Sequence, residues 1–304
     1  MSGFDDGWLA LREGADDRAR DAALERTLLR ALHLHTRGRS GAAGGATRVL
    51  DLGSGTGANF RRLAPVLGAN QHWTLVDHDR DLLGRLEARS RLWCETHRAT
   101  LSSEGDAVTV TGARFDARVE RRAAELATEL DQLPFEGADL VTGSALLDLA
   151  GAAWLDALAA RCAGAGAAVL FVLGYDGRVR WTPSFADDGD VHARFDRHQR
   201  QDKGLGVALG PDATGHFAAQ LRVHDLDVRT ATSDWALDDG EIALQRELAD
   251  GFANAAGEID PDFIDRAATW IDARRRALEA APAARPATTL IGHLDVAAWP
   301  RQTG

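Results

Sequence analysis

The chain has 304 residues, of which 45% are hydrophobic, and this is enough for one large or two small domains with a buried core. A formal net charge of -11 at pH 7 disfavours nucleic-acid binding, which depends on a dense Lys/Arg surface, and favours small-molecule partners. No stretch has the pattern of a signal peptide, and no apolar run reaches the roughly 18 residues of a membrane span, so we expect a cytoplasmic protein without a membrane partner. Cys94 and Cys162 lie far apart without companions at metal-ligand spacing, so neither a disulfide nor a metal site is expected.

Residues 1–46 are expected to form an N-terminal helical cap and a linker. Apolar residues between Trp8 and Leu34 recur at helical spacing, with charged residues between them. The stretch 38–47, rich in glycine and alanine, then predicts a flexible connection to the first strand.

Residues 47–304 are expected to form one α/β domain. Strand patterns at 48–52, 72–77, 108–115, 138–145 and 167–175 alternate with helical patterns at 59–67, 79–96, 117–130 and 152–163. This alternation predicts a Rossmann-like, mostly parallel sheet with helices on both faces. A helix that starts at 210–212, a strand at 226–237, helices at 241–256 and 262–280, and a strand at 288–299 follow.

A glycine-rich loop follows the first strand, in the sequence VLDLGSGTGAN from Val49 to Asn59. Glycines let backbone N–H groups approach a ligand closely, and the next helix adds partial positive charge at its N-terminus. The loop also satisfies the dinucleotide pattern G-x-G-x-x-G/A, so an NAD(P)-linked oxidoreductase is one interpretation. Asp51 lies inside the strand, where a carboxylate is costly without a partner, and a ligand ammonium would supply one.

The segment DLGSGTG resembles motif I of the class I S-adenosylmethionine-dependent methyltransferases. The resemblance covers roughly residues 47–299 and implies a seven-stranded sheet whose last strand is antiparallel. Strands six and seven would be 226–237 and 288–299, with a helical insertion at about 239–284 between them. It implies S-adenosylmethionine as the cofactor. The implied cofactor contacts are Asp51, Gly53, Ser54, Gly55, Gly57, Asn59, Asp77, His78, Phe115, Asp116 and Ser144.

Two of these aspartates also have a simpler interpretation. Asp77 ends the second strand, where the resemblance places the ribose ligand, with His78 beside the adenine. Asp77 could instead cap the next helix, although Asp79 is better placed to do so. Asp116 follows the predicted third strand, where the resemblance implies contact with the adenine amino group, but a helix cap is the competing interpretation.

Three residues are candidates for the chemistry at the acceptor. Asp148, in the segment SALLD after the fourth strand, would lie where the methyl group meets the acceptor, as a base, an anchor or a plain helix-start carboxylate. Tyr175 follows the fifth strand and could position an acceptor or pack. His198 is the most plausible general base by residue type, because imidazole titrates near neutral pH.

The segment after the fifth strand also offers candidates for acceptor binding. Trp181 could form an aromatic wall, or belong to a local core. Arg197, Arg200 and Lys203 could pair with an anionic acceptor, or lie on a solvated helix face. Near the N-terminus, Arg12, Arg18 and Arg20 could reach the methionyl carboxylate, although surface pairing with neighbouring aspartates is favoured.

The function expected from these patterns is methyl transfer to a small-molecule acceptor. A non-catalytic S-adenosylmethionine-binding protein and an NAD(P)-linked oxidoreductase are the alternatives. The oxidoreductase would need a separate substrate domain, and only a short helical insertion and one strand follow Ile242. The sequence leaves open the acceptor, the methylated atom and the oligomeric state.

Overall fold

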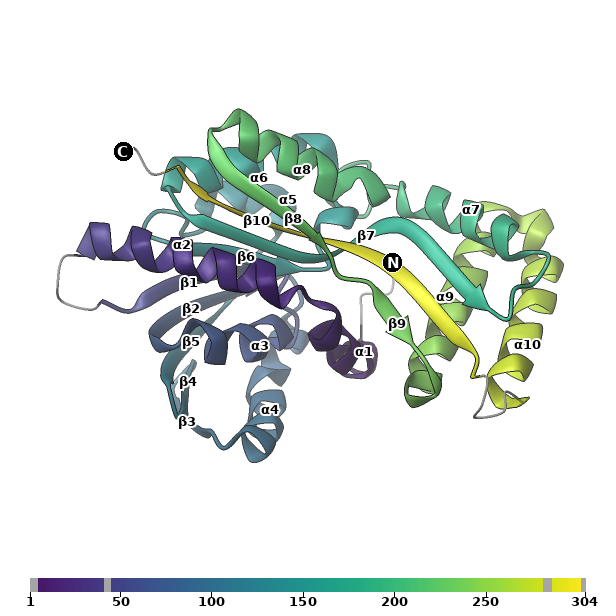
Figure 1. Cartoon of the computed structure of the whole chain (residues 1–304), viewed down its shortest axis with the longest axis horizontal. Coiled ribbons are helices and arrows are strands. Elements are labelled where there is room, and N and C mark those ends of the chain that lie inside the picture. The colour runs from purple at the N-terminus through teal and green to yellow at the C-terminus, as the bar shows by residue number, and fades with distance from the viewer. Residues whose placement is uncertain (1–4, 41–44, 281–285, 302–304) are drawn as a thin grey trace.

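The computed structural model describes residues 5–40, 45–280 and 286–301, and its strands form one sheet (Figure 1). Among these residues, ten strands lie in the order β3-β4-β5-β2-β1-β6-β7-β10-β8, and β9 pairs with β10. The strands are β1 (Thr47–Leu52), β2 (Ala69–Asp77), β3 (Thr100–Glu104), β4 (Ala107–Gly112), β5 (Phe115–Ala123), β6 (Leu140–Ser144), β7 (Ala168–Thr182), β8 (Leu226–Thr232), β9 (Trp235–Leu237) and β10 (Thr288–Pro300).

The helices predicted at 59–67, 79–96, 152–163, 241–256 and 262–280 begin and end within a few residues of those positions, and the one predicted at 117–130 does not. The α-helices of the structure are α1 (Asp6–Ala19), α2 (Ala22–Ser40), α3 (Ala58–Leu67), α4 (Arg80–His97), α5 (Leu126–Glu129), α6 (Ala152–Ala165), α7 (Asp188–Gln199), α8 (Ala213–Val223), α9 (Ile242–Ile259) and α10 (Ile264–Ala280). Because α2 continues to Ser40, the predicted linker is shorter than expected, and its residues 41–44 lie outside the described residues. None of the described helices combines the length and apolar character needed to span a membrane.

The expected mostly parallel, Rossmann-like sheet is confirmed, but the expected number of seven strands is wrong. Strands β5, β2, β1, β6 and β7 run parallel, and β10 is antiparallel to both β7 and β8. The additional strands are β3, β4 and β9. Strands β3 and β4 form a hairpin at one edge of the sheet. The predicted strand 226–237 is divided into β8 and β9, and β9 pairs with β10.

The region after α4 differs from the prediction of a strand at 108–115 and a helix at 117–130. The chain instead turns at Gly112 and forms β5, which pairs with both β4 and β2. In β5 the buried residues Phe115, Ala117 and Val119 alternate with more exposed ones, which is the period of a strand rather than of a helix. The helix α5 has only four residues.

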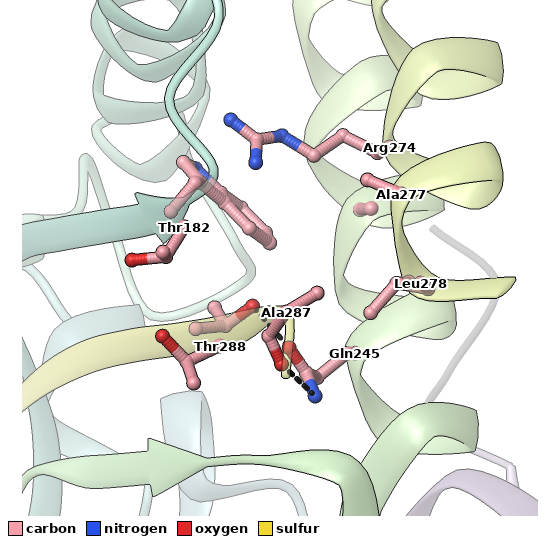
Figure 2. Close-up of a pocket in the computed structure, with 10 residues that line it drawn as sticks. Thr182, Gln245, Arg274, Ala277, Leu278, Ala287 and Thr288 are labelled. Atoms are coloured by element: carbon pink, nitrogen blue, oxygen red, sulfur yellow. Dashed lines mark hydrogen bonds between the residues drawn. The ribbon is translucent and has the colours of Figure 1, made fainter. Parts of the chain in front are cut away.

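Strands β7 and β10 extend beyond the parallel part of the sheet. The pairing of β6 with β7 ends at Ser144 and Val172, and β7 continues to Thr182 against β10. Helices α7, α9 and α10 pack on this extension, so the predicted helical insertion is present at its side (Figure 1). Figure 2 shows Thr182 and Thr288 at the end of the extension, near Gln245 from α9 and Arg274 from α10.

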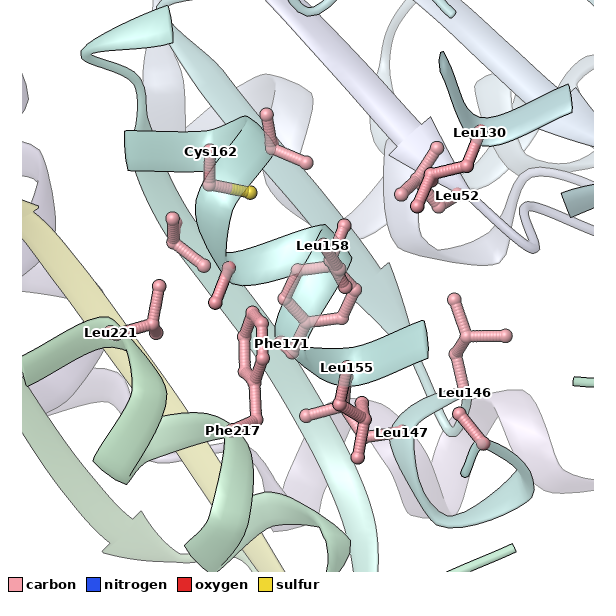
Figure 3. Close-up of a cluster of buried hydrophobic side chains, with 14 of the residues drawn as sticks. Leu52, Leu130, Leu146, Leu147, Leu155, Leu158, Cys162, Phe171, Phe217 and Leu221 are labelled. Atoms are coloured by element: carbon pink, nitrogen blue, oxygen red, sulfur yellow. The ribbon is translucent and has the colours of Figure 1, made fainter. Parts of the chain in front are cut away.

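Helices cover both faces of the parallel sheet, as expected. On one face, α2, α3 and α4 bury residues such as Leu28, Phe60 and Leu86. On the other face, α6 and α8 pack on β7, and Figure 3 shows Phe171 of β7 beside Phe217 of α8. Both cysteines are buried and free in these layers. The two cores fix the strands, and the carboxyl ends of those strands position the site.

Candidate functional site

The glycine-rich loop joins β1 to α3 at the carboxyl edge of the sheet. Gly53, Gly55 and Gly57 have φ angles of 63°, 52° and 82°, in the left-handed region that residues with a Cβ rarely adopt. A Cβ on Gly53 would lie 3.2 Å from Leu146, and one on Gly55 would lie 3.1 Å from Leu9. The loop is therefore enclosed on two sides, by α1 and by the segment after β6.

Asp51 is completely buried in β1 beside this loop. Asn59 Nδ2 donates hydrogen bonds to Asp51 Oδ1 at 2.8 Å and to Thr142 Oγ1 at 3.1 Å. The second carboxylate oxygen, Oδ2, has no hydrogen-bond partner among the described residues. Burial raises the pKa of Asp51 from 3.8 to about 7, while the Asn59 hydrogen bond and the Arg20 guanidinium lower it. The free oxygen suits a cationic hydrogen-bond donor.

Arg20 lies between α1 and α2 and brings a buried guanidinium to the same place. Its Nε donates to Glu25 Oε1 at 2.8 Å, and its Nη1 donates to Asn59 Oδ1 at 2.8 Å. Its Nη2 is buried and has no partner in the described chain. The expected surface pairing is therefore wrong for Arg20, whereas Arg12 does pair with Asp16, at 2.9 Å and 3.1 Å.

Asp77 lies on the other side of the loop, at the end of β2. The Gly55 N–H donates to Asp77 Oδ2 at 2.7 Å, and the Asp79 N–H donates to Oδ1 at 3.0 Å. Asp79 caps α4 by accepting two main-chain hydrogen bonds, as expected, so Asp77 is not the cap. The exposed His78 places Nδ1 3.3 Å from Asp77 Oδ1. The structure thus brings Asp77 and His78 to the glycine loop.

Two of the other predicted cofactor contacts, Ser54 and Ser144, lie at the carboxyl edge of the sheet. The two in β5, Phe115 and Asp116, do not. Ser54 is in the loop, with a buried hydroxyl that has no partner among the described residues, and Ser144 ends β6. Phe115 and Asp116 begin β5, and Asp116 lies opposite Asn70 at the amino end of β2. The predicted cofactor contacts of Phe115 and Asp116, including that of Asp116 with the adenine amino group, are therefore wrong.

The residues that follow β5 at the carboxyl edge are Ala124 and Glu125. The Ala124 N–H donates to the main-chain oxygen of Asp77 at 3.0 Å, and the Glu125 side chain is exposed. The alternation of buried and exposed residues in β5 was the signal that could have located them.

A second polar cluster lies beyond the end of β6, beside the middle of β7. Asp148, in the one-turn helix η2 (Leu147–Leu149), is 9% exposed, and its Oδ1 has no partner among the described residues. Burial raises the pKa of Asp148 to about 6, and the main-chain N–H of Asp148 itself together with the Arg12 and Lys203 charges opposes this rise. Asp148 is therefore a second buried carboxylate with a free oxygen.

Tyr175 lies beside this cluster, opposite His293 of β10, and its hydroxyl contacts α7. The hydroxyl donates to Asp196 Oδ1 at 2.8 Å and lies 3.0 Å from His192 Nε2. Burial and the Asp196 carboxylate raise the pKa of Tyr175. Its ring packs edge-on against Phe195, with the ring centroids 5.6 Å apart. These contacts favour a packing and anchoring role for Tyr175 over that of a base.

The predicted base His198 is held by two charged neighbours. Its Nδ1 lies 3.1 Å from Lys203 Nζ, and its Nε2 lies 3.1 Å from Glu258 Oε2. Burial, together with the Lys203 charge, lowers the pKa of His198. Of this group, Lys203 is the residue whose charge also acts on Asp148.

The remaining predicted acceptor contacts lie elsewhere. Arg197 is exposed on α7, and Arg200 pairs with Asp212 at 2.8 Å on the surface. Trp181 is buried between Phe252 and Trp270, with centroid distances of 5.5 Å to both rings. Six residues of strand separate it from Tyr175, or roughly 20 Å. The structure therefore does not bring Arg197, Arg200 and Trp181 to the carboxylates.

His293 in β10 is a polar residue for which the sequence indicated no role. It lies opposite Tyr175 in the antiparallel register, is 5% exposed, and leaves Nδ1 without a partner among the described residues. Burial, reinforced by the Arg12 charge, lowers the pKa of His293 to about 3, so the ring is neutral at physiological pH. Its ring centroid is 5.0 Å from that of Trp235, and Arg12 lies 5.0 Å over the same indole.

The backbone is strained around this cluster. Ala145 follows β6 with φ of 51°, and Leu173 in β7 has φ of 59°, although neither is glycine. The Leu173 N–H donates to the buried Asp295 carboxylate at 2.8 Å, and the Ser233 hydroxyl donates to it at 2.5 Å. Asp295 therefore holds the irregular part of β7 in place beside the polar cluster.

Two pockets lie away from these residues. One, of about 180 Å³, is at the amino end of β1, β2 and β5 and is lined by Arg48, His72 and Arg118 among others. The other is the small pocket of Figure 2, between Trp181, Gln245 and Arg274. Among the described residues, no group of three or more His, Cys, Asp or Glu side chains has the arrangement of a metal site.

Comparison with family models gives no match, and neither does comparison with curated proteins. Among solved structures, the chain is similar to an S-adenosylmethionine-dependent methyltransferase from Geobacter sulfurreducens in complex with S-adenosyl-L-homocysteine, with 16% identity, a TM-score of 0.45 and coverage of 99% of this chain and 100% of that one. It is also similar to YjhP from E. coli, with 15% identity, a TM-score of 0.43 and coverage of 97% and 99%.

Proposed function

We propose that the protein is an S-adenosylmethionine-dependent methyltransferase acting on a small molecule. The observation that carries this proposal is the pair of free polar groups beside the glycine loop. Asp51 Oδ2 is an acceptor without a donor, Arg20 Nη2 is a donor without an acceptor, and Asn59 is hydrogen-bonded to both side chains. An α-amino acid presents the complementary groups, an ammonium and a carboxylate on one carbon.

The methionyl part of S-adenosylmethionine fits this pair. Its ammonium would bind Asp51, its carboxylate would bind Arg20, and the glycine loop would contact the nucleoside. Asp77, which already holds the loop through the Gly55 N–H, would lie beside the ribose. A dinucleotide fits less well, because its anionic pyrophosphate would have to lie near the buried, uncompensated Asp51 carboxylate.

Bound S-adenosylmethionine supplies a methyl group activated by the sulfonium. The protein has to align the acceptor with that methyl group and exclude water. Leu9 of α1 and Leu146 after β6 lie over the glycine loop on two sides and provide the enclosure. Asp148, buried with a free oxygen, would lie on the acceptor side, which favours an enzyme over a protein that only binds the cofactor.

Calorimetric titration with S-adenosylhomocysteine tests the binding site. Arg20→Gln removes a charged hydrogen-bond donor, which contributes about 1.5–3 kcal/mol, and should weaken binding at least tenfold. The matched control is Arg18→Gln, because Arg18 is two residues away on α1, 59% exposed, and paired with Glu241. Binding of NAD(P) in place of S-adenosylhomocysteine, or equal effects of both substitutions, would overturn the proposal.

Turnover requires a separate measurement. The protein incubated with cofactor carrying a labelled methyl group and with small-molecule extract should release a labelled product and S-adenosylhomocysteine. Tight cofactor binding without any labelled product would favour the alternative of a non-catalytic binding protein.

A further inference from the structure

The polar cluster beyond β6, beside the middle of β7, has buried polar atoms that the chain does not use. Asp148 Oδ1 and His293 Nδ1 are both buried and lack partners among the described residues. Tyr175 lies between the two side chains, because it is opposite His293 in the strand register and the one-turn helix η2, which carries Asp148, packs against β7. Arg12 lies over the Trp235 ring that packs on His293, and its charge lowers the pKa of both Asp148 and His293.

The negative charge of Asp148 is not neutralised by an ion pair. Arg12, the first cation that acts on it, forms a two-point ion pair with Asp16, at 2.9 Å and 3.1 Å. Lys203, the second, lies 3.1 Å from His198, and the Glu258 carboxylate also acts on its charge. Neither cation bonds to Asp148, so the carboxylate keeps both its charge and its free oxygen.

His293 contributes an uncharged acceptor beside this carboxylate. Its low pKa leaves the ring neutral, so one of its nitrogens carries a lone pair. Trp235 packs on the ring at 5.0 Å, and the edge of Trp8 lies against Trp235 with centroids 6.5 Å apart. Arg12 covers the face of Trp235 at 5.0 Å, so Trp235 fixes the His293 ring from behind and does not offer an open surface of its own.

We propose, building on the proposed methyl transfer, that Asp148 and His293 hold the acceptor and that the acceptor is a small amine. An ammonium offers several N–H donors and a positive charge, which matches two free acceptors and one uncompensated carboxylate. A hydroxyl offers one donor, and a carboxylate or phosphate would be repelled by Asp148.

The transfer is balanced without a further reactant. The ammonium gives one proton to the Asp148 carboxylate, and the freed nitrogen lone pair forms a bond to the methyl carbon. The bond between that carbon and sulfur breaks, and its electron pair stays on sulfur. The products are a methylated ammonium and S-adenosylhomocysteine, and the Asp148 proton is released to solvent.

Three probes of equal size separate the acceptor classes: phenethylamine, 2-phenylethanol and phenylacetate. Each is titrated calorimetrically into the complex of the protein with S-adenosylhomocysteine. We expect the amine to bind at least tenfold more tightly than the alcohol and the acid, and to gain one methyl group by mass spectrometry when S-adenosylmethionine replaces the product. Equal or tighter binding of the alcohol or the acid, or no binding of the amine, would overturn the acceptor assignment.

Variants connect this preference to the named residues. Asp148→Asn keeps the shape of the side chain and should abolish the preference for the amine, while the Kd for S-adenosylhomocysteine stays unchanged. His293→Phe should weaken amine binding through the second acceptor, and Asp156→Asn, an exposed residue of α6 that accepts from His216, is the matched control. If both site variants still bind the amine more tightly than the alcohol and the acid, this inference is contradicted. If the wild-type protein does not bind S-adenosylhomocysteine, the proposed function is contradicted.

Discussion

Replacing Asp51 by asparagine should stabilise the free protein at pH 8 while it destroys the cofactor site. Burial raises the pKa of Asp51 from 3.8 to about 7, so the ionised form costs the folded state about 4 kcal/mol relative to the unfolded chain. Asn59 can still donate to the oxygen of an asparagine at position 51. The new amide N–H group finds no acceptor, which costs about 1–3 kcal/mol. The net gain is therefore about 1–3 kcal/mol.

The sign of this effect depends on pH. Below pH 3.8 Asp51 is protonated in both states, and between pH 3.8 and about 7 only the unfolded chain ionises, so stability falls as pH rises through this window. Above about pH 7 the full cost is present. At pH 5 the cost is about 1.6 kcal/mol, close to the cost of the unpaired amide, and the two proteins should be nearly equal in stability.

Thermal unfolding of wild type and Asp51→Asn at both pH values measures this difference. A gain of 1–3 kcal/mol corresponds to a rise in Tm of several degrees, at about 2–4 °C per kcal/mol. Calorimetry on the same samples should show that the variant no longer binds S-adenosylhomocysteine. The reasoning is refuted if Asp51→Asn lowers the Tm equally at pH 8 and pH 5, because the buried carboxylate would then be stabilising.

Gly57→Ala should destabilise the protein by about 2 kcal/mol or more, because φ is 82° there and the new Cβ would lie 2.5 Å from Leu86 Cδ1. Gly84→Ala, inside α4 with no atom within 4 Å of the new Cβ, should instead stabilise it by about 0.5–1 kcal/mol. Unfolding in urea measures both, and the reverse order would contradict the strain argument. The Kd for S-adenosylhomocysteine should rise as pH falls below about 7, because protonated Asp51 cannot balance the charge of the ligand ammonium. A Kd that stays constant from pH 8 to pH 5 would show that Asp51 does not bind this ammonium.

Much of the cofactor end of the site could be predicted from local sequence. Asp51 and the three glycines lie within one strand–loop–helix unit, and Asp77 ends the next strand, so the parallel arrangement alone brings them to one edge. Asp79 was identified as the helix cap from its position, which left Asp77 free for the loop. The error in β5 arose because arginine and glutamate between small apolar residues suit a helix as well as a strand edge, and pairing with β4 and β2 decided the outcome.

The acceptor end could not be predicted in this way. Trp181 lies close to Tyr175 in sequence, but β7 continues as a strand and carries it along the extension. Helix α7 returns to Tyr175, yet Arg197 is on its exposed face and Arg200 pairs with Asp212 on the surface. Arg20 and His293 reach the site from the two ends of the chain, through the packing of α1 and the register of β10 on β7.

The sequence by itself determined the class of fold and the location of the glycine loop, because periodicity and glycine chemistry act over a few neighbouring residues. Only the tertiary structure decided which polar groups remain buried without partners, since that depends on contacts between α1, β1, β7 and β10. Those free groups, on Asp51 and Arg20 for the cofactor and on Asp148 and His293 for the acceptor, are properties of the packed chain and not of any segment.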